Sequence, residues 1–167
     1  MSFVILEKVR SEMLMKEKKL ILKLIEKGYR IATAESCTGG MIASTIVNVP
    51  MASKVLDESI VTYSNEAKVK YLGVKPETIE NVGVVSEEVV AEMAAGIAKA
   101  SGANVGVGVS GIAGPTGATE TKPVGMVCFG FYIDGKVQTF TKYFKGSRTA
   151  VRKKSTKFVI DKLLEIL

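Results

Sequence analysis

Two glycine-containing loops combine residue types that could do chemistry. Residues 33–40 read TAESCTGG and residues 110–117 read SGIAGPTG. Hydroxyl groups beside glycines suit a loop that holds a polar or anionic ligand against backbone amides. The chain has no histidine, which excludes Ser-His-Asp and Cys-His catalysis and disfavours a zinc site. Acid–base chemistry must therefore come from Lys, Tyr, Glu or Asp.

Two sequence motifs near the second loop fail on their context. Residues 106–111 spell G-x-G-x-x-G, but the first two glycines lie inside a predicted strand and no helix is predicted after Gly111, which disfavours a dinucleotide site. Residues 108–112 approach the G-x-S-x-G nucleophile elbow, but Ile112 replaces the last glycine and no histidine exists to activate the serine. Neither a P-loop nor an S-x-x-K arrangement is present.

Ser36 is the remaining candidate nucleophile, because its hydroxyl lies on a predicted strand-to-helix connection. The structural interpretation makes Ser36 or Thr38 the N-cap of the following helix. The functional interpretation uses the same geometry, since free amides at a helix start can hold a phosphate or stabilise an oxyanion. The two interpretations are compatible with each other, because a capping hydroxyl and a ligand can share one helix start.

Composition and charge limit the class of protein. The chain has 167 residues with 47% hydrophobic content, which suits one globular domain. Its net charge of +6 is spread along the sequence, and aromatic content is 7% without tryptophan, so tight nucleic-acid binding is disfavoured and a small anionic ligand fits. Cys37 and Cys128 are isolated, and no signal-peptide pattern or membrane-spanning run is found. We expect a cytoplasmic protein that does not associate with membranes.

Hydrophobic periodicity predicts alternating helices and strands before a late hairpin. Predicted helices cover residues 6–27, 38 or 39 to 47, 64–72, 86–100 and the last 20 residues. Predicted strands cover residues 29–33, 59–63, 105–109, 124–133 and 136–144. Asp134-Gly135 is the strongest hairpin signal. Alternate glycines in the strand at 105–109 predict a closely approaching backbone or ligand.

This order predicts an α/β fold: a single domain over residues 1–167, built as a three-layer α/β/α sandwich whose mixed sheet includes the late β-hairpin. In such open sheets, ligands bind where loops leave the carboxyl ends of the strands. Both candidate loops are predicted to lie there.

Five segments in order resemble one family. Residues 33–40 (TAESCTGG), 61–68 (VTYSNEAK), 83–86 (GVVS), 111–115 (GIAGP) and 122–125 (KPVG) resemble the CinA C-terminal domain, the nicotinamide mononucleotide deamidase (PncC) family, from about Leu14 onward. The resemblance implies hydrolysis of nicotinamide mononucleotide to nicotinate mononucleotide and ammonia, a pyridine-nucleotide salvage step. It implies a reaction without a metal or an organic cofactor. It also implies that the small-molecule partner is a nucleotide and that the protein forms a homodimer or a larger homo-oligomer.

The resemblance also implies roles for individual residues. Ser36, Tyr63 and Lys68 match the family's catalytic residues. The substrate-binding residues that it implies are Thr38, Gly39, Gly40, Ser110, Gly111, Gly114, Gly117, Lys122 and Arg148. The sequence departs from the family pattern at Ser110, where threonine is usual, at Ser147, where an aspartate is common, and at Met51, where glycine is usual.

Other interpretations remain open from the residues alone. Lys68 could pair with a surface acid such as Glu66, and Tyr63 could be a half-buried packing residue. Cys37 is expected to be a packing residue rather than a nucleophile. Beside an amidohydrolase, the chain could be a nucleotide-binding module with weak catalysis, or an interaction protein related to competence and DNA damage.

Overall fold

The computed structural model describes the backbone of residues 3–167 and the side chains of residues 15–167. The elements are α1 (Phe3–Lys27), β1 (Ile31–Glu35), α2 (Met41–Val47), a 3₁₀ turn η1 (Ala52–Lys54), β2 (Leu56–Val61), α3 (Asn65–Leu72), α4 (Pro76–Val82), α5 (Glu87–Ser101), β3 (Val105–Gly111), β4 (Met126–Ile133), β5 (Lys136–Tyr143) and α6 (Arg148–Ile166).

All five strands form one mixed sheet in the order β2-β1-β3-β4-β5. β2, β1 and β3 are parallel, so their carboxyl ends meet at one edge of the sheet. β4 runs antiparallel to β3, and β5 pairs with β4 through the predicted Asp134-Gly135 hairpin. The predicted mixed sheet with a late hairpin is confirmed.

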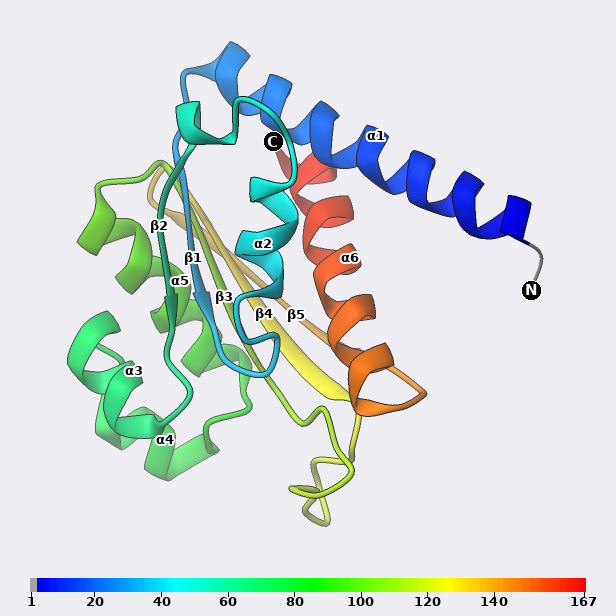
Figure 1. Cartoon of the computed structure of the whole chain (residues 1–167). Coiled ribbons are helices and arrows are strands. Elements are labelled where there is room, and N and C mark those ends of the chain that lie inside the picture. The colour runs from blue at the N-terminus through cyan, green and yellow to red at the C-terminus, as the bar shows by residue number, and fades with distance from the viewer. Residues whose placement is uncertain (1–2) are drawn as a thin grey trace.

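Helices cover both faces of the sheet (Figure 1). One core packs α1, α2 and α6 against the bulky strand residues, including Val107, Phe129 and Phe131. The other core packs α3 and α5 against small strand residues such as Ala32 and Ala34. The α/β/α layering predicted from the element order is therefore confirmed.

The strand glycines allow α5 to approach the sheet closely. A Cβ atom on Gly106 would lie 2.1 Å from the Ala94 carbonyl oxygen, and one on Gly108 would lie 2.6 Å from that of Val90. A Cβ atom on Gly130 of β4 would lie 2.1 Å from the same Val90 carbonyl oxygen. Because any side chain here would overlap the helix backbone, the alternate glycines serve packing, and the predicted close approach is by α5.

Helix caps were predicted better than strand ends. Ser64 and Ser86 cap α3 and α5 through their hydroxyls, and Gly73 and Gly102 end these helices with a left-handed backbone. β1 was predicted two residues too early, and β2 was predicted three residues too late at its start. The predicted start of α2 at residue 38 or 39 is wrong, because α2 begins at Met41.

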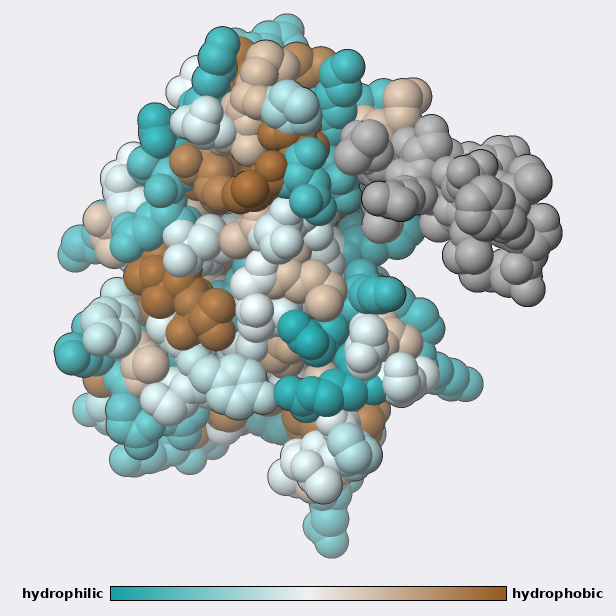
Figure 2. Space-filling view, viewed as in Figure 1, coloured by the Kyte–Doolittle hydropathy of each residue, from teal (hydrophilic) through white to brown (hydrophobic). Residues whose placement is uncertain are grey.

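In the part of the chain that the structure describes, no helix is long and apolar enough to cross a membrane. Figure 2 shows that hydrophobic side chains on the visible face gather only in small, separate patches among hydrophilic ones. Met51 and Val61, near the two ends of edge strand β2, are among the exposed apolar residues.

Candidate active site

A cavity of about 550 Å³ opens where the parallel strands β1, β2 and β3 end. This is the edge at which open α/β sheets bind ligands, and the volume suits a small molecule. The lining residues are Ser36, Cys37, Tyr63, Asn65, Lys68, Gly83, Val84, Val85, Ser110, Gly111, Ile112, Ala113, Gly114, Thr116, Gly117, Thr119, Lys122 and Arg148.

Ser36 and Lys68 meet in this cavity. Lys68 Nζ lies 3.2 Å from Ser36 Oγ and donates a 2.7 Å hydrogen bond to the Thr62 carbonyl oxygen. Ser64 caps α3, which places Lys68 at the end of the first helical turn, pointing back toward the strand ends. Only 1% of Lys68 and 9% of Ser36 is exposed to solvent.

Burial favours the uncharged form of Lys68. Desolvation lowers the pKa of the Lys68 ammonium from its ordinary value of 10.5, because a low-dielectric environment disfavours the charged form. No ion pair of Lys68 is found among the residues whose side chains are described. The interpretation of Lys68 as a solvated partner of Glu66 is therefore wrong.

The buried carboxylate of Glu35 holds the loop that carries Ser36. Glu35 accepts hydrogen bonds from the amides of Gly40, Ile42 and Ala43 at 2.9–3.1 Å. A negative charge at this position also complements the positive end of the α2 dipole. Sequence reasoning missed Glu35, although an acid just before a predicted helix start is a recognisable signal.

The N-cap interpretation of Ser36 and Thr38 is wrong. Gly39 and Gly40 both adopt left-handed backbones, with φ of 59° and 88°, and Gly40 is the N-cap of α2 without a side-chain bond. These two residues add a turn between Ser36 and the helix. The Ser36 hydroxyl is consequently left to face Lys68 and the cavity.

The same turn removes three predicted ligand contacts from the cavity. Thr38, Gly39 and Gly40 do not line it. The Gly39 amide donates to the Ser36 carbonyl, and the Gly40 amide donates to Glu35. The Thr38 carbonyl accepts a 2.8 Å hydrogen bond from Arg152 Nη2. The glycine amides at the start of α2 are thus occupied within the protein rather than free for an anion.

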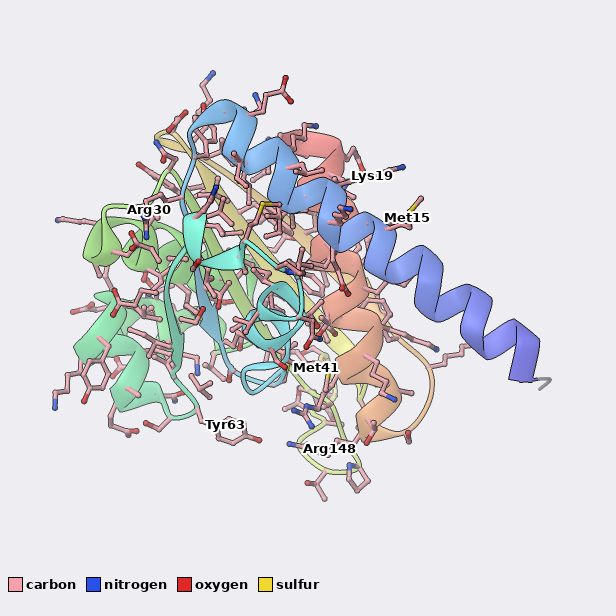
Figure 3. The ribbon with its side chains drawn as sticks, turned by 45° about the horizontal axis from the view of Figure 1, so that its top comes forward. Met15, Lys19, Arg30, Met41, Tyr63 and Arg148 are labelled. Atoms are coloured by element: carbon pink, nitrogen blue, oxygen red, sulfur yellow. The ribbon has the colours of Figure 1, made fainter. Side chains whose placement is uncertain are left out.

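Arg148 and Tyr63 form the open side of the cavity. Arg148 Nη1 donates to the Gly114 carbonyl and Nη2 donates to the Tyr63 hydroxyl, both at 2.9 Å. Figure 3 shows both side chains at the same end of the sheet, far from Arg30 at the other end. Tyr63 is 63% exposed and bonds to Arg148 rather than to Ser36 or Lys68.

The structure shows the local setting of all three departures from the family pattern. Ser147 accepts a hydrogen bond from the Ala150 amide and so caps α6. Arg148 is held by Gly114 and Tyr63 and has no ion pair among the side chains of residues 15–167. The buried Ser110 hydroxyl donates to the Val84 carbonyl at 2.8 Å, which ties the end of β3 to the segment before α5. Met51 has a left-handed φ of 75°, a conformation that favours glycine.

The second candidate loop forms one wall of the cavity. Gly111, Gly114 and Gly117 all line it. Lys122 also lines it and donates to the Val82 carbonyl at the end of α4. Gly83 has a left-handed φ of 79°, which favours glycine, and a Cβ atom there would lie 2.8 Å from Lys122 Nζ and displace the end of that side chain. The structure thus brings Ser110, these three glycines, Lys122 and Arg148 together around one cavity.

Cys37 lines the cavity but is not set up as a nucleophile. Burial raises the pKa of its thiol to about 12, so the reactive thiolate is absent near neutral pH. The apolar lining residues Val84, Val85, Ile112 and Ala113 were not singled out from the sequence. They lie within the GVVS and GIAGP segments, and they give the cavity an apolar surface on which a flat ring can pack.

Comparisons with known proteins agree with this architecture. The family model described as the CinA C-terminal domain matches residues 14–167. A CinA-like protein of Kosmotoga olearia is 51% identical over 143 residues, which is 85% of this chain and 35% of that protein. A putative competence-damage inducible protein of Clostridium acetobutylicum is 54% identical over 138 residues, covering 83% of this chain and 34% of that protein. The chain thus spans about a third of the length of the curated relatives it matches.

Solved structures also match. The crystal structure of a competence-damaged protein (CinA) superfamily protein from Escherichia coli has a TM-score of 0.90 at 34% identity and covers 93% of this chain and 90% of that one. A competence or damage-inducible protein from Enterobacter asburiae has a TM-score of 0.89 at 38% identity, with 92% and 96% covered.

Proposed function

The chain belongs to the CinA C-terminal domain family, and from this membership and the cavity we propose that it hydrolyses the carboxamide of nicotinamide mononucleotide. The products are nicotinate mononucleotide and ammonia. The observation that carries the proposal is the 3.2 Å approach of Lys68 Nζ to Ser36 Oγ in a chain without histidine. Serine and lysine together supply the nucleophile and base that amide hydrolysis needs.

The first half of the reaction forms an acyl-enzyme. Neutral Lys68 accepts the Ser36 proton as Oγ attacks the carboxamide carbon, which gives a tetrahedral intermediate. Lys68 then returns the proton to the amide nitrogen, the C–N bond breaks, and ammonia leaves. In the second half, Lys68 accepts a proton from water as the water oxygen attacks the ester carbon. The C–Oγ bond of the resulting tetrahedral intermediate then breaks, Lys68 returns the proton to Ser36 Oγ, and nicotinate mononucleotide leaves.

The electrostatics of Lys68 support this role. A lysine is a base only when it is uncharged, and burial favours that form by lowering its pKa. The hydrogen bond to the Thr62 carbonyl fixes the direction of Nζ. Activity is accordingly expected to rise with pH until the lowered pKa of Lys68 is passed.

The open side of the cavity supports recognition of the substrate phosphate. Arg148 and Lys122 are two cations that line the cavity, and charge-assisted hydrogen bonds to phosphate are stronger than neutral ones. The nicotinamide ring would lie against the apolar residues nearer Ser36. The Tyr63 hydroxyl accepts a hydrogen bond from Arg148. In this proposal, Tyr63 therefore orients Arg148 toward the phosphate and does not carry a proton.

Ammonia release from nicotinamide mononucleotide by the purified chain tests the proposal. We expect steady release without added metal or cofactor, and much slower release from free nicotinamide, which lacks the ribose phosphate. A chain that binds the nucleotide but releases no ammonia would instead be a binding module. A chain that does neither would fit the interaction-protein alternative.

A further inference from the structure

Arg152 of α6 is a partly buried cation that holds the Ser36 loop from outside the active-site cavity. Its Nη2 atom donates a 2.8 Å hydrogen bond to the Thr38 carbonyl oxygen, and a Cβ atom on Gly39 would lie 3.3 Å from the same nitrogen. α6 lies beside α2 on one face of the sheet (Figure 1). Arg152 therefore reaches the loop from an element that is far from it in the sequence.

The charge of Arg152 has no acidic partner. Arginine side chains that are removed from solvent are normally paired, but Arg152 has no ion pair among the side chains of residues 15–167. Its charge acts beside the candidate nucleophile. Burial and the Glu35 carboxylate raise the pKa of the Cys37 thiol, to about 12, while the charges of Arg148 and Arg152 act against this rise.

The backbone amides of the Ser36 loop are almost all occupied. Within residues 36–43, the amides of residues 36 and 39–43 donate to acceptors inside the protein. The amides of Cys37 and Thr38 donate to no other residue in the described part of the chain. The buried Thr38 hydroxyl has no partner there either. Cys37 is 5% exposed and lines the cavity, and buried amides normally have an acceptor, so its amide is available to a ligand atom.

Amide hydrolysis at Ser36 needs such a donor, because the carbonyl oxygen gains negative charge as Oγ attacks. The amide of the residue after the nucleophile is a common donor for this oxygen. We propose that Arg152 is a positioning residue for this step. By holding the Thr38 carbonyl, it fixes the turn in which the Cys37 amide is free to bind the carbonyl oxygen of the substrate. The inference rests on the proposed hydrolysis at Ser36.

Steady-state ammonia release by Arg152→Ala tests this role. We expect kcat for nicotinamide mononucleotide to fall roughly ten- to hundredfold, the factor that loss of one charged hydrogen bond contributes. KM should change by less than about twofold, because Arg152 does not line the cavity. Lys153→Ala removes the same charge at the next, exposed position of α6 and should change neither constant. An unchanged kcat in Arg152→Ala, or an equal fall in Lys153→Ala, would overturn the proposal.

Rescue by guanidinium separates positioning from a purely structural role. Because Arg152 is partly exposed, its truncation to alanine leaves a space that a guanidinium ion can enter from solvent. At tens of millimolar, far below the molar concentrations that unfold proteins, guanidinium should raise kcat of Arg152→Ala severalfold and leave that of the unaltered chain unchanged. A folded variant without rescue would assign Arg152 to stability alone and overturn the proposal. If Arg152→Ala does not fold, kcat and KM of Arg152→Met, which keeps an unbranched stem and loses the donor, decide by the same criteria.

A serine-reactive probe distinguishes failure of this inference from failure of the proposed function. Phenylmethylsulfonyl fluoride modifies an activated serine: Oγ bonds to sulfur, fluoride leaves, and the base takes the hydroxyl proton. Mass spectrometry should find the label at Ser36, with slower labelling in Arg152→Ala. A chain labelled in this way that releases no ammonia would refute the proposed substrate and keep the positioning role. Equal labelling rates in the two chains, or neither labelling nor ammonia release, would overturn the inference.

Discussion

The floor and the mouth of the candidate active site differ in how their side chains are held. At the floor, Ser36, Lys68 and Glu35 are buried, and Lys68 and Glu35 are fixed by bonds to the backbone. At the mouth, Tyr63 and Arg148 are exposed and bond to each other. Bond-making chemistry needs atoms fixed to within fractions of an ångström, whereas a phosphate must reach its cations from solvent. The difference supports the proposal that the chemistry takes place at the floor and that the phosphate is recognised at the mouth.

If the floor does the chemistry, Lys68→Arg should have a large effect. Arginine keeps the positive charge but cannot be deprotonated, so kcat/KM should fall by roughly 10²- to 10⁴-fold, the usual contribution of a general base. The rate of ammonia release from nicotinamide mononucleotide measures this fall in kcat/KM. Lys70→Arg, an exposed position on the same helix, is the control. Full activity in Lys68→Arg would mean that charge alone matters at this position.

If the mouth only recognises the phosphate, Arg148→Ala should act selectively. Losing one charged contact costs about 1.5–3 kcal/mol, which is roughly a ten- to hundredfold loss in kcat/KM for nicotinamide mononucleotide. The riboside, which has no phosphate, should lose little, so the preference for the mononucleotide shrinks. Lys145→Ala, another exposed cation, is the matched control. An equal loss for both substrates would assign Arg148 to the reacting amide instead.

Glu35→Gln should show that the floor depends on its buried carboxylate. The amide has one acceptor oxygen for the three amides that Glu35 accepts from, so the free energy of unfolding should fall by about 1–3 kcal/mol. Denaturant unfolding measures this loss, and kcat should fall while KM changes little because the mouth is intact. Unchanged stability and an unchanged kcat would show that Glu35 does not hold the Ser36 loop in position.

Lys68→Met should be inactive but more stable at neutral pH, by about 1 kcal/mol, because it removes a buried ammonium. The folded-state pKa of Lys68 is lowered, so its cost to stability is largest below that pKa and vanishes as pH rises toward 10.5, the ordinary value. Unfolding curves of both proteins from pH 7 to 10 should converge. A less stable Lys68→Met at pH 7 would contradict this account.

Local signals predicted the capped helices α3 and α5 well, and they predicted the other loops and helix starts less well. The serine caps and glycine ends of α3 and α5 act within one turn, so the sequence alone identifies them. α4 was missed because it buries no residue and lacks an apolar period, although Pro76 and Gly83 mark its ends. β1 and β2 were misplaced because their ends depend on pairing with each other rather than on local composition.

The candidate site was predictable in its members but not in its contacts. The strand ends place Ser36, Ser110 and Tyr63 at one edge, as parallel topology requires. Excluding Thr38 and Gly40 required knowing that two successive left-handed glycines extend the loop and that Glu35 occupies the helix start. Such backbone choices are set by tertiary contacts, which residue types alone do not specify.

Ser36→Ala is the most direct test of the central claim that Ser36 is the nucleophile at the floor. We predict that ammonia release from nicotinamide mononucleotide falls by a factor of about 10³ or more, while the melting temperature stays within about 4 °C, since only one hydrogen bond is lost. Ser53→Ala, an exposed serine, should retain full activity. A folded Ser36→Ala protein that keeps a substantial part of the wild-type rate would contradict the account.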